Sequence, residues 1–199
     1  MRYCIMIDEK LKIAVDKSNE LNKMLENEAK LENGMISTKR ILHMVQHCTK
    51  TRIGVAYLPF SKALGKSSNY GAMMSVYNED EQQVADIIVN SDMDAEYQRF
   101  SLIHELGHLM TGKYNVEEKS KGYKISAHIN QDVFSIPKEE YDRDVSLLNE
   151  QIANVFALRV LIPFNELMKR IDSNGNLNEI AKSFGVTRDA IISRIVLGM

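Results

Sequence analysis

The sequence predicts an α+β fold in which helices surround a small three-stranded sheet. Three short runs rich in β-branched and apolar residues, at 52–60, 71–77 and 83–90, lie among longer segments with helical periodicity. Helices and strands do not alternate regularly along the chain, which argues against a sheet built from βαβ units. Helices packed around a separate sheet are therefore expected.

Composition limits the class of protein. The chain has 199 residues, of which 44% are hydrophobic and 26% charged, as in globular proteins with a substantial core. The net charge of −2 gives no general attraction to nucleic acid or acidic membranes. Cys4 and Cys48 are too few for a disulfide framework, and no segment has the apolar length of a signal peptide or membrane span. We therefore expect a soluble, cytoplasmic protein with reduced thiols.

The first half of the chain predicts helices followed by strands. Spaced apolar residues between positions 8 and 33 indicate an amphipathic helix or helix pair that ends near Gly34. Residues 37–48 indicate a second helix with Ser37 or Thr38 as its N-cap. Pro59 closes the first strand, and the turn formers between the second and third strands predict a hairpin.

The second half is mainly helical. A helix is predicted from Asp94 to Gly112, whose glycine suits the position after a helix end. The weakly periodic stretch 111–144 is expected to be a long excursion with some local structure. A strong helix from 145 to 162 stops at Pro163, and three shorter helices complete the chain.

A histidine pair in the helix 94–112 indicates a metal site. His104 and His108 are four residues apart, so on a helix their imidazoles share one face and can bind one ion. Glu105 lies about 100° further round the axis, where its carboxylate can hold and deprotonate a water molecule beside the ion. The alternative is an ordinary helix with two half-buried histidines. Gly107 favours the metal site, because a glycine within a helix costs about 1 kcal/mol and indicates close approach of another backbone or a ligand.

A catalytic zinc ion needs a third protein ligand. A third histidine in the spacing H-E-x-x-H-x-x-G-x-x-H is excluded, because Thr111 and Tyr114 occupy the required glycine and histidine positions. The other option is a glutamate from a later helix. Glu150 stands among apolar residues of the helix 145–162, where an unpaired carboxylate is costly. The pattern alone leaves open whether Glu150 binds metal or lies at the border of the apolar face.

Together the two helices resemble the ImmA/IrrE family of metallopeptidases. In its familiar form an R-F-T-x-x-H-E-x-G-H helix precedes an E-x-x-A-N-x-F-A-x-x-L-L-x-P helix. This chain departs from that form at Ser101, which replaces threonine, and at Arg159, which stands where a small or acidic residue is frequent. The matching residues are Arg99, Phe100, His104, Glu105, Gly107 and His108, followed by Glu150, Ala153, Asn154, Phe156, Ala157, Leu161 and Pro163.

The resemblance implies a zincin-like catalytic domain. It implies His104, His108 and Glu150 as ligands of one Zn²⁺ per chain and Glu105 as the general base. Family members cleave bacterial or phage transcriptional regulators, so a helix-turn-helix repressor is the implied substrate. We expect an N-terminal helical segment at 1–48, the catalytic domain at 49–170, and a C-terminal helical pair at 171–199 packed on it.

Two other groups of residues carry weaker signals. His43 and His47 are also four apart, but no glutamate follows the first, and we expect a structural or surface role. His128, Tyr114 and Tyr123 could each donate a hydrogen bond to a developing oxyanion, although a loop position in solvent is the simpler interpretation.

The last two helices resemble a helix-turn-helix. Only Lys182, Arg188 and Arg194 could contact DNA. The apolar residues Ile191, Ile192, Ile195, Val196 and Leu197 are numerous enough to bury the second helix against the domain. We expect packing or partner binding rather than direct nucleic-acid binding. The alternative is a DNA-binding regulator with a non-catalytic metal site.

Overall fold

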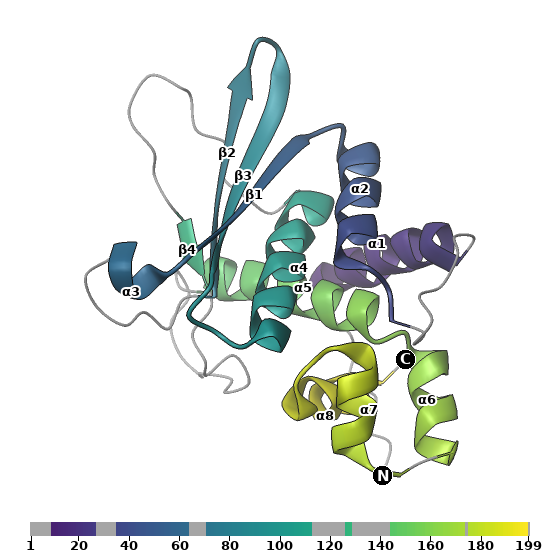
Figure 1. Ribbon diagram of the computed structural model, residues 1–199. Helices are drawn as coiled ribbons and strands as arrows, with labels where there is room; N and C mark the ends of the chain where they lie inside the picture. Colours follow the sequence, from purple (N-terminus) through teal and green to yellow (C-terminus); the bar gives the residue numbers. More distant parts are fainter. Residues whose placement is uncertain are drawn as a thin grey trace.

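The computed structural model describes residues 9–26, 35–63, 71–112, 126–128, 144–173 and 175–198 (Figure 1). Helices and a small sheet form separate layers, which confirms the predicted α+β class. In the described residues the elements are α1 (Glu9–Glu26), α2 (Thr38–Thr49), β1 (Arg52–Leu58), α3 (Phe60–Ala63), β2 (Ala72–Glu79), β3 (Gln82–Asn90), α4 (Ala95–Thr111), β4 (Ser126–His128), α5 (Asp144–Leu161), α6 (Phe164–Ser173), α7 (Leu177–Phe184) and α8 (Arg188–Leu197).

The sheet has the strand order β1-β3-β2-β4. β1 is parallel to β3, whereas β2 is antiparallel to both β3 and β4. β2 and β3 form the predicted hairpin, and its turn residues Asp80 and Glu81 have φ values of 48° and 66°, as tight hairpin turns require. The three-residue strand β4 and the short helix α3 were not predicted. Both are too short to show a period, and β4 is defined only by its pairing with β2.

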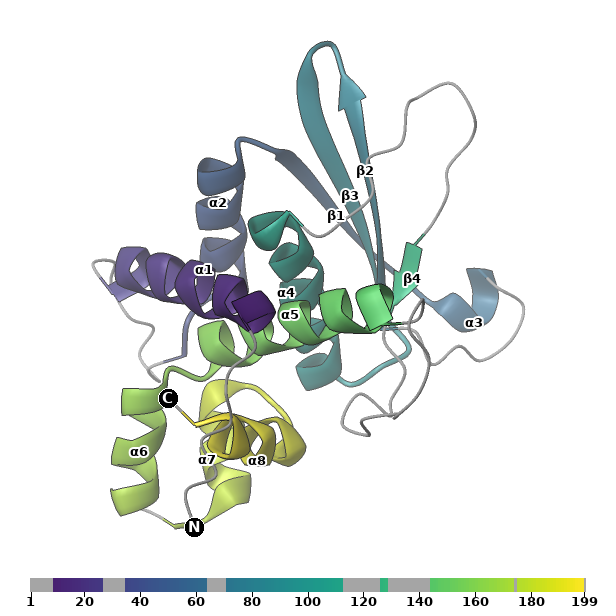
Figure 2. The same cartoon turned by 180° about the vertical axis from the view of Figure 1, so that it is seen from behind.

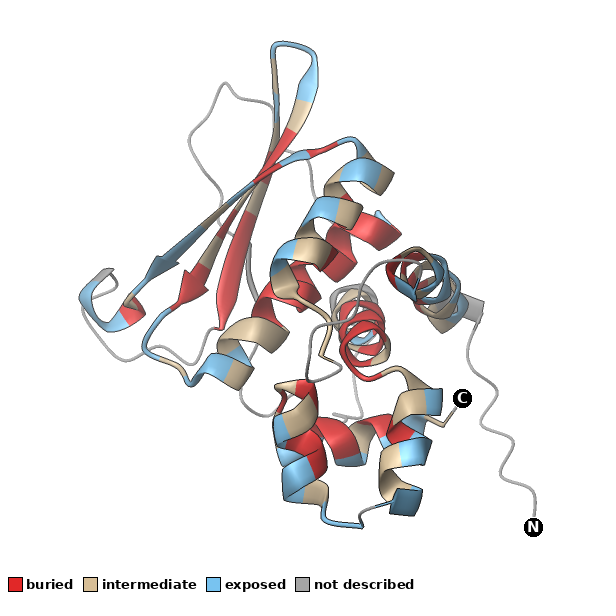
Figure 3. Ribbon diagram, turned by 45° about the vertical axis from the view of Figure 1, so that its right-hand side comes forward, coloured by how far each residue is buried: buried red, intermediate tan, exposed pale blue. Residues whose placement is uncertain are grey.

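The helix α4 is the centre of the molecule. It lies between the hairpin strands and α5, with α2 beside it (Figures 1 and 2). Every residue from Ser101 to Thr111 is buried, and Figure 3 shows the buried residues gathered along α4, α5 and the strands that face them. A helix buried on all sides can carry polar groups only where they find partners inside the fold.

The N-terminal helix α1 packs along α5. Arg159 on α5 donates from Nε to Ser18 Oγ at 3.0 Å and from Nη2 to Asn19 Oδ1 at 2.9 Å. Asn22 Nδ2 in turn donates to the carbonyl oxygen of Arg159 at 3.1 Å. The arginine that departs from the family motif therefore fastens α1 to the core.

The turn between α7 and α8 rests against the first half of α4. Gly185 has a φ of 62°, and a Cβ atom there would lie 2.9 Å from Arg99 Nη1 and 2.6 Å from Met35 Sδ. A larger residue would be strained and would also lack space. Arg99 Nη2 donates to the carbonyl oxygen of Ile36 at 2.7 Å, so the half-buried guanidinium group of this α4 residue contacts two other segments, the one before α2 and the turn at Gly185.

α8 packs against α7 and α5, as expected, but it buries only one of the five apolar residues that could have covered it. Only Ile191 is buried, and the side of α8 that faces the core also presents Ala190 and Arg194. The geometry of a helix explains this, because only one face of α8 meets the core and the remaining residues point away from it. The exposed residues are Ile192, Ile195, Val196 and Leu197.

Among the described residues, no single helix is both long and apolar enough to cross a bilayer. The segments Leu147–Leu161 and Phe164–Ser173 reach the necessary length and composition only together, and they are bent by 55° at their junction.

Candidate metal centre

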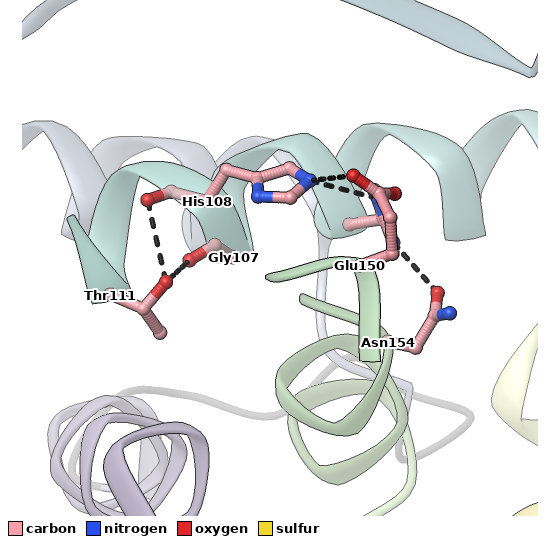
Figure 4. Close-up of polar contacts among 6 residues, drawn as sticks. Gly107, His108, Thr111, Glu150 and Asn154 are labelled. Atoms are coloured by element: carbon pink, nitrogen blue, oxygen red, sulfur yellow. Dashed lines mark hydrogen bonds and ion pairs between the residues drawn. The ribbon is translucent and has the colours of Figure 1, made fainter. Parts of the chain in front are cut away.

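Two helices bring three potential ligands together. His104 and His108 lie on α4, and Glu150 lies on α5, 46 residues away from His104 in the sequence. Figure 4 shows His108 and Glu150 pointing toward one another from the two helices. The two Nε2 atoms are 3.1 Å apart, and Glu150 lies 3.1 Å from His104 Nε2 and 3.4 Å from His108 Nε2 through its two oxygens. In the part of the chain that the structure describes, no other group of three His, Cys, Asp or Glu residues could hold a metal ion.

These spacings suit a zinc ion. Ligand atoms at the usual 2.0–2.1 Å from tetrahedral zinc are roughly 3.3 Å from one another. The two Nε2 atoms are 3.1 Å apart and His104 Nε2 is 3.1 Å from Glu150 Oε2, both close to this value, while His108 Nε2 faces the other carboxylate oxygen, Oε1, at 3.4 Å. With one ligand atom taken from each residue, the three atoms lie within 4.8 Å of one another. Two imidazole nitrogens and a carboxylate are also the donor set of catalytic zinc sites that keep a fourth position for water or substrate.

The protonation states favour metal binding. Burial lowers the pKa of His104, so its ring stays neutral at physiological pH and keeps a lone pair for a ligand bond. Burial alone would raise the pKa of the Glu150 carboxyl. The two histidines that face its oxygens outweigh that effect and hold the pKa well below its usual range. A neutral histidine and an ionised glutamate are the forms that bind zinc.

Glu105 lies on the turn of α4 that carries the histidines. Its side chain is almost fully buried, and its Oε1 atom has no hydrogen-bond partner among the described residues. Burial raises the pKa of its carboxyl well above the usual value, and the negative charge of Glu150 raises it further. A buried, unsatisfied and readily protonated carboxyl group beside a metal site has the properties of a general base.

Gly107 allows α5 to approach α4 closely. A Cβ atom at this position would lie 3.0 Å from Phe156 Cδ1 and 3.1 Å from the carbonyl oxygen of Ala153. The expected close approach of a second backbone is therefore confirmed. It has a direct consequence for the site, because Glu150 lies one turn before Ala153 on α5 and is carried toward the histidines.

Asn154 is part of the site, a role that its pattern in the sequence did not indicate. Its Oδ1 atom lies 2.7 Å from His104 Nδ1 (Figure 4). The available signal was its spacing: Asn154 is four residues after Glu150, so both side chains lie on one face of α5.

The other sequence candidates lie elsewhere. His43 and His47 are exposed on α2 and line an open depression of about 460 Å³, in agreement with the surface role expected for them. Tyr114 and Tyr123 lie outside the described residues, and of His128 only the backbone, in β4, is described. Their suggested contacts with an oxyanion thus remain predictions.

Comparison with known families gives one match. The model of the IrrE N-terminal-like domain, Peptidase_M78, matches residues 48–196. The match begins at the end of α2, includes both helices of the candidate metal centre and extends through most of α8, whereas α1 lies outside it. No curated protein matches the chain.

Proposed function

The chain belongs to the M78 family of metallopeptidases, and on that premise we propose that it is a zinc endopeptidase that cleaves a transcriptional repressor. One observation carries the proposal: His104, His108 and Glu150 converge from two helices beside a buried and unsatisfied Glu105. The His₂Glu donor set favours zinc over the harder divalent cations, which prefer oxygen ligands.

The bound zinc ion and Glu105 would have different roles in the hydrolysis. When bound, zinc would polarise the scissile carbonyl group and lower the pKa of a water molecule in the site. Glu105 accepts the proton of the attacking water as its oxygen forms a bond to the carbonyl carbon. Glu105 then gives this proton to the amide nitrogen as the C–N bond breaks, so that the new amine leaves neutral. A carboxyl pKa above its usual value makes Glu105 a stronger proton acceptor for the first step.

The substrate class follows from the resemblance to the ImmA/IrrE peptidases. Their substrates are helix-turn-helix regulators, and cleavage of a repressor would release transcription. A protein substrate agrees with membership of a peptidase family. The same proposal places the enzyme in the cytoplasm, where a repressor acts.

Metal content tests the first part of the proposal. We expect about one zinc per chain, measured by plasma mass spectrometry on protein purified without a histidine tag. His104→Ala and Glu150→Ala should both lose the zinc. A wild-type protein that takes up no zinc when it is supplied would overturn the assignment, and zinc retained by Glu150→Ala would remove the third ligand.

Cleavage tests the second part. The zinc-loaded protein should cut a cognate helix-turn-helix repressor, observed as defined fragments by mass spectrometry. Glu105→Gln should keep its zinc and lose roughly 10²–10⁴-fold in rate, because it cannot accept a proton. Full cleavage by this variant would exclude Glu105 from the mechanism. If the zinc-loaded enzyme leaves repressors intact but cuts other proteins, the proposed substrate class is wrong.

A further inference from the structure

His104 is held from both sides of its ring. Its side chain is wholly buried, and its Nε2 atom faces His108 and Glu150 at 3.1 Å each. Its Nδ1 atom, on the opposite side of the ring, lies 2.7 Å from Asn154 Oδ1. One nitrogen is therefore directed at the candidate metal position and the other at an amide oxygen.

We infer that Asn154 is a positioning residue that fixes the tautomer and the ring orientation of His104 for metal binding. This inference rests on the proposed zinc site. An amide oxygen can only accept a hydrogen bond, so its partner Nδ1 must carry the hydrogen. A neutral imidazole with hydrogen on Nδ1 has a lone pair on Nε2, the atom that faces the other two ligands.

The turn of α5 that carries Asn154 also carries the ligand Glu150 and the residue that contacts α4. Glu150 and Asn154 lie one turn apart on the same face of the helix. Ala153, between them, forms the close contact with Gly107 on α4. The same turn of α5 thus supplies a ligand, the helix contact that sets the spacing, and the group that orients a ligand on the other helix.

Loss of the hydrogen bond between Asn154 and His104 should lower the affinity for the metal ion. Without Asn154 the ring of His104 could rotate or carry its hydrogen on Nε2, and either change must be reversed before a metal ion binds. Loss of such a hydrogen bond to a metal-binding histidine typically weakens metal affinity by about 10- to 100-fold.

Three variants of the full-length protein separate the hydrogen bond from packing. Asn154→Leu keeps a similar volume but removes the acceptor, whereas Asn154→Asp keeps an acceptor oxygen. Gln151→Leu is the matched control, because Gln151 is exposed on the same turn of α5. Zinc affinity is measured by competition with a chromophoric chelator. The absorption spectrum of the cobalt-substituted protein reports the geometry of the ligands independently of catalysis.

We expect Asn154→Leu to bind zinc roughly 10- to 100-fold more weakly, with an altered cobalt spectrum. Asn154→Asp and Gln151→Leu should stay close to the wild type. Wild-type affinity in Asn154→Leu would overturn the inference, and so would equal losses in the leucine and aspartate variants. If melting curves show the leucine variant to be unfolded, Asn154→Ala takes its place, because it adds no bulk. A wild-type protein without zinc affinity would instead overturn the proposed metal site and this inference with it.

Discussion

Glu105 and Arg194 are both ionisable residues with only about 1% of their surface exposed, but they differ in their hydrogen-bond partners. Arg194 donates to two backbone carbonyl oxygens, those of Ile162 and Gly198, and its guanidinium group lies over the ring of Phe164. Glu105 has a buried oxygen with no partner among the described residues. A buried charge that the fold satisfies holds elements together, whereas one left unsatisfied beside converging ligands indicates a site of chemistry.

The helix pair α4 and α5 differs in the same way from the C-terminal pair α7 and α8. In α4 and α5 the polar residues point inward at one another and form the candidate metal centre. In α8 the inward-pointing basic residue is structural, and four apolar residues lie on the surface instead. Burial removes Arg194 from the residues available to DNA and leaves Arg188 and Lys182 exposed on the C-terminal pair. This distribution weakens the resemblance of the pair to a DNA-binding motif.

Removing the arginine should give the largest change in stability. In Arg194→Met, two carbonyl oxygens lose a charged donor, which should lower the free energy of unfolding by about 2–4 kcal/mol. Because Arg194 lies outside the metal centre, zinc content per folded chain should not change. Urea denaturation and metal analysis of the same sample check both statements. A stable variant that lost its zinc would contradict the structural role of Arg194.

Crowding the contact between α4 and α5 should have a smaller effect on stability but should reach the metal centre. Overpacking in Gly107→Ala costs about 1–3 kcal/mol, partly offset by the better helix propensity of alanine. A net loss of roughly 1–2 kcal/mol is expected, together with weaker zinc binding because Glu150 moves with α5. Thermal melting and chelator competition measure the two effects. Unchanged zinc affinity would show that the site tolerates a shift of α5.

Neutralising the unsatisfied carboxyl group should stabilise the metal-free protein. Because the pKa of Glu105 is raised in the folded state, the folded chain holds its proton more tightly than the unfolded chain. The stability of the wild type should therefore fall as the pH rises from about 4.3, the usual glutamate value, through the raised pKa. The stability of Glu105→Gln should not show this fall with pH, because glutamine does not ionise.

In the presence of a chelator, the glutamine variant should melt a few degrees above the wild type near pH 7, since about 1 kcal/mol corresponds to roughly 2–4 °C in a chain of this size. The difference should disappear near pH 4. Arg194→Lys serves as the control: it retains Glu105, so the difference between its melting temperature and that of the wild type should not change with pH over this range. Equal melting temperatures of Glu105→Gln and wild type across this range would contradict the unsatisfied state of Glu105.

Local features of the molecule could be predicted from the sequence. The helix that bears His104, Glu105 and His108, its end at Gly112 and the β2–β3 hairpin all appear close to their expected positions. These features depend on periodicity, caps and turn residues within about 20 positions, and such local signals survive in the tertiary structure. Gly107 indicated close approach of either another backbone or a ligand, because a glycine within a helix is costly, and the structure shows the backbone of Ala153 there.

Relations between distant segments were decided only by the tertiary structure. The pattern left the role of Glu150 open and gave none to Asn154, which meet His104 from 46 and 50 residues away. The pairing of β4 with β2, the burial of Arg194 and the exposure of most of α8's apolar side chains likewise depend on which elements lie side by side. The physical reason is that hydrogen bonding and burial depend on distances in space. A glutamate or arginine looks the same in the sequence whether or not the fold places a hydrogen-bond partner next to it.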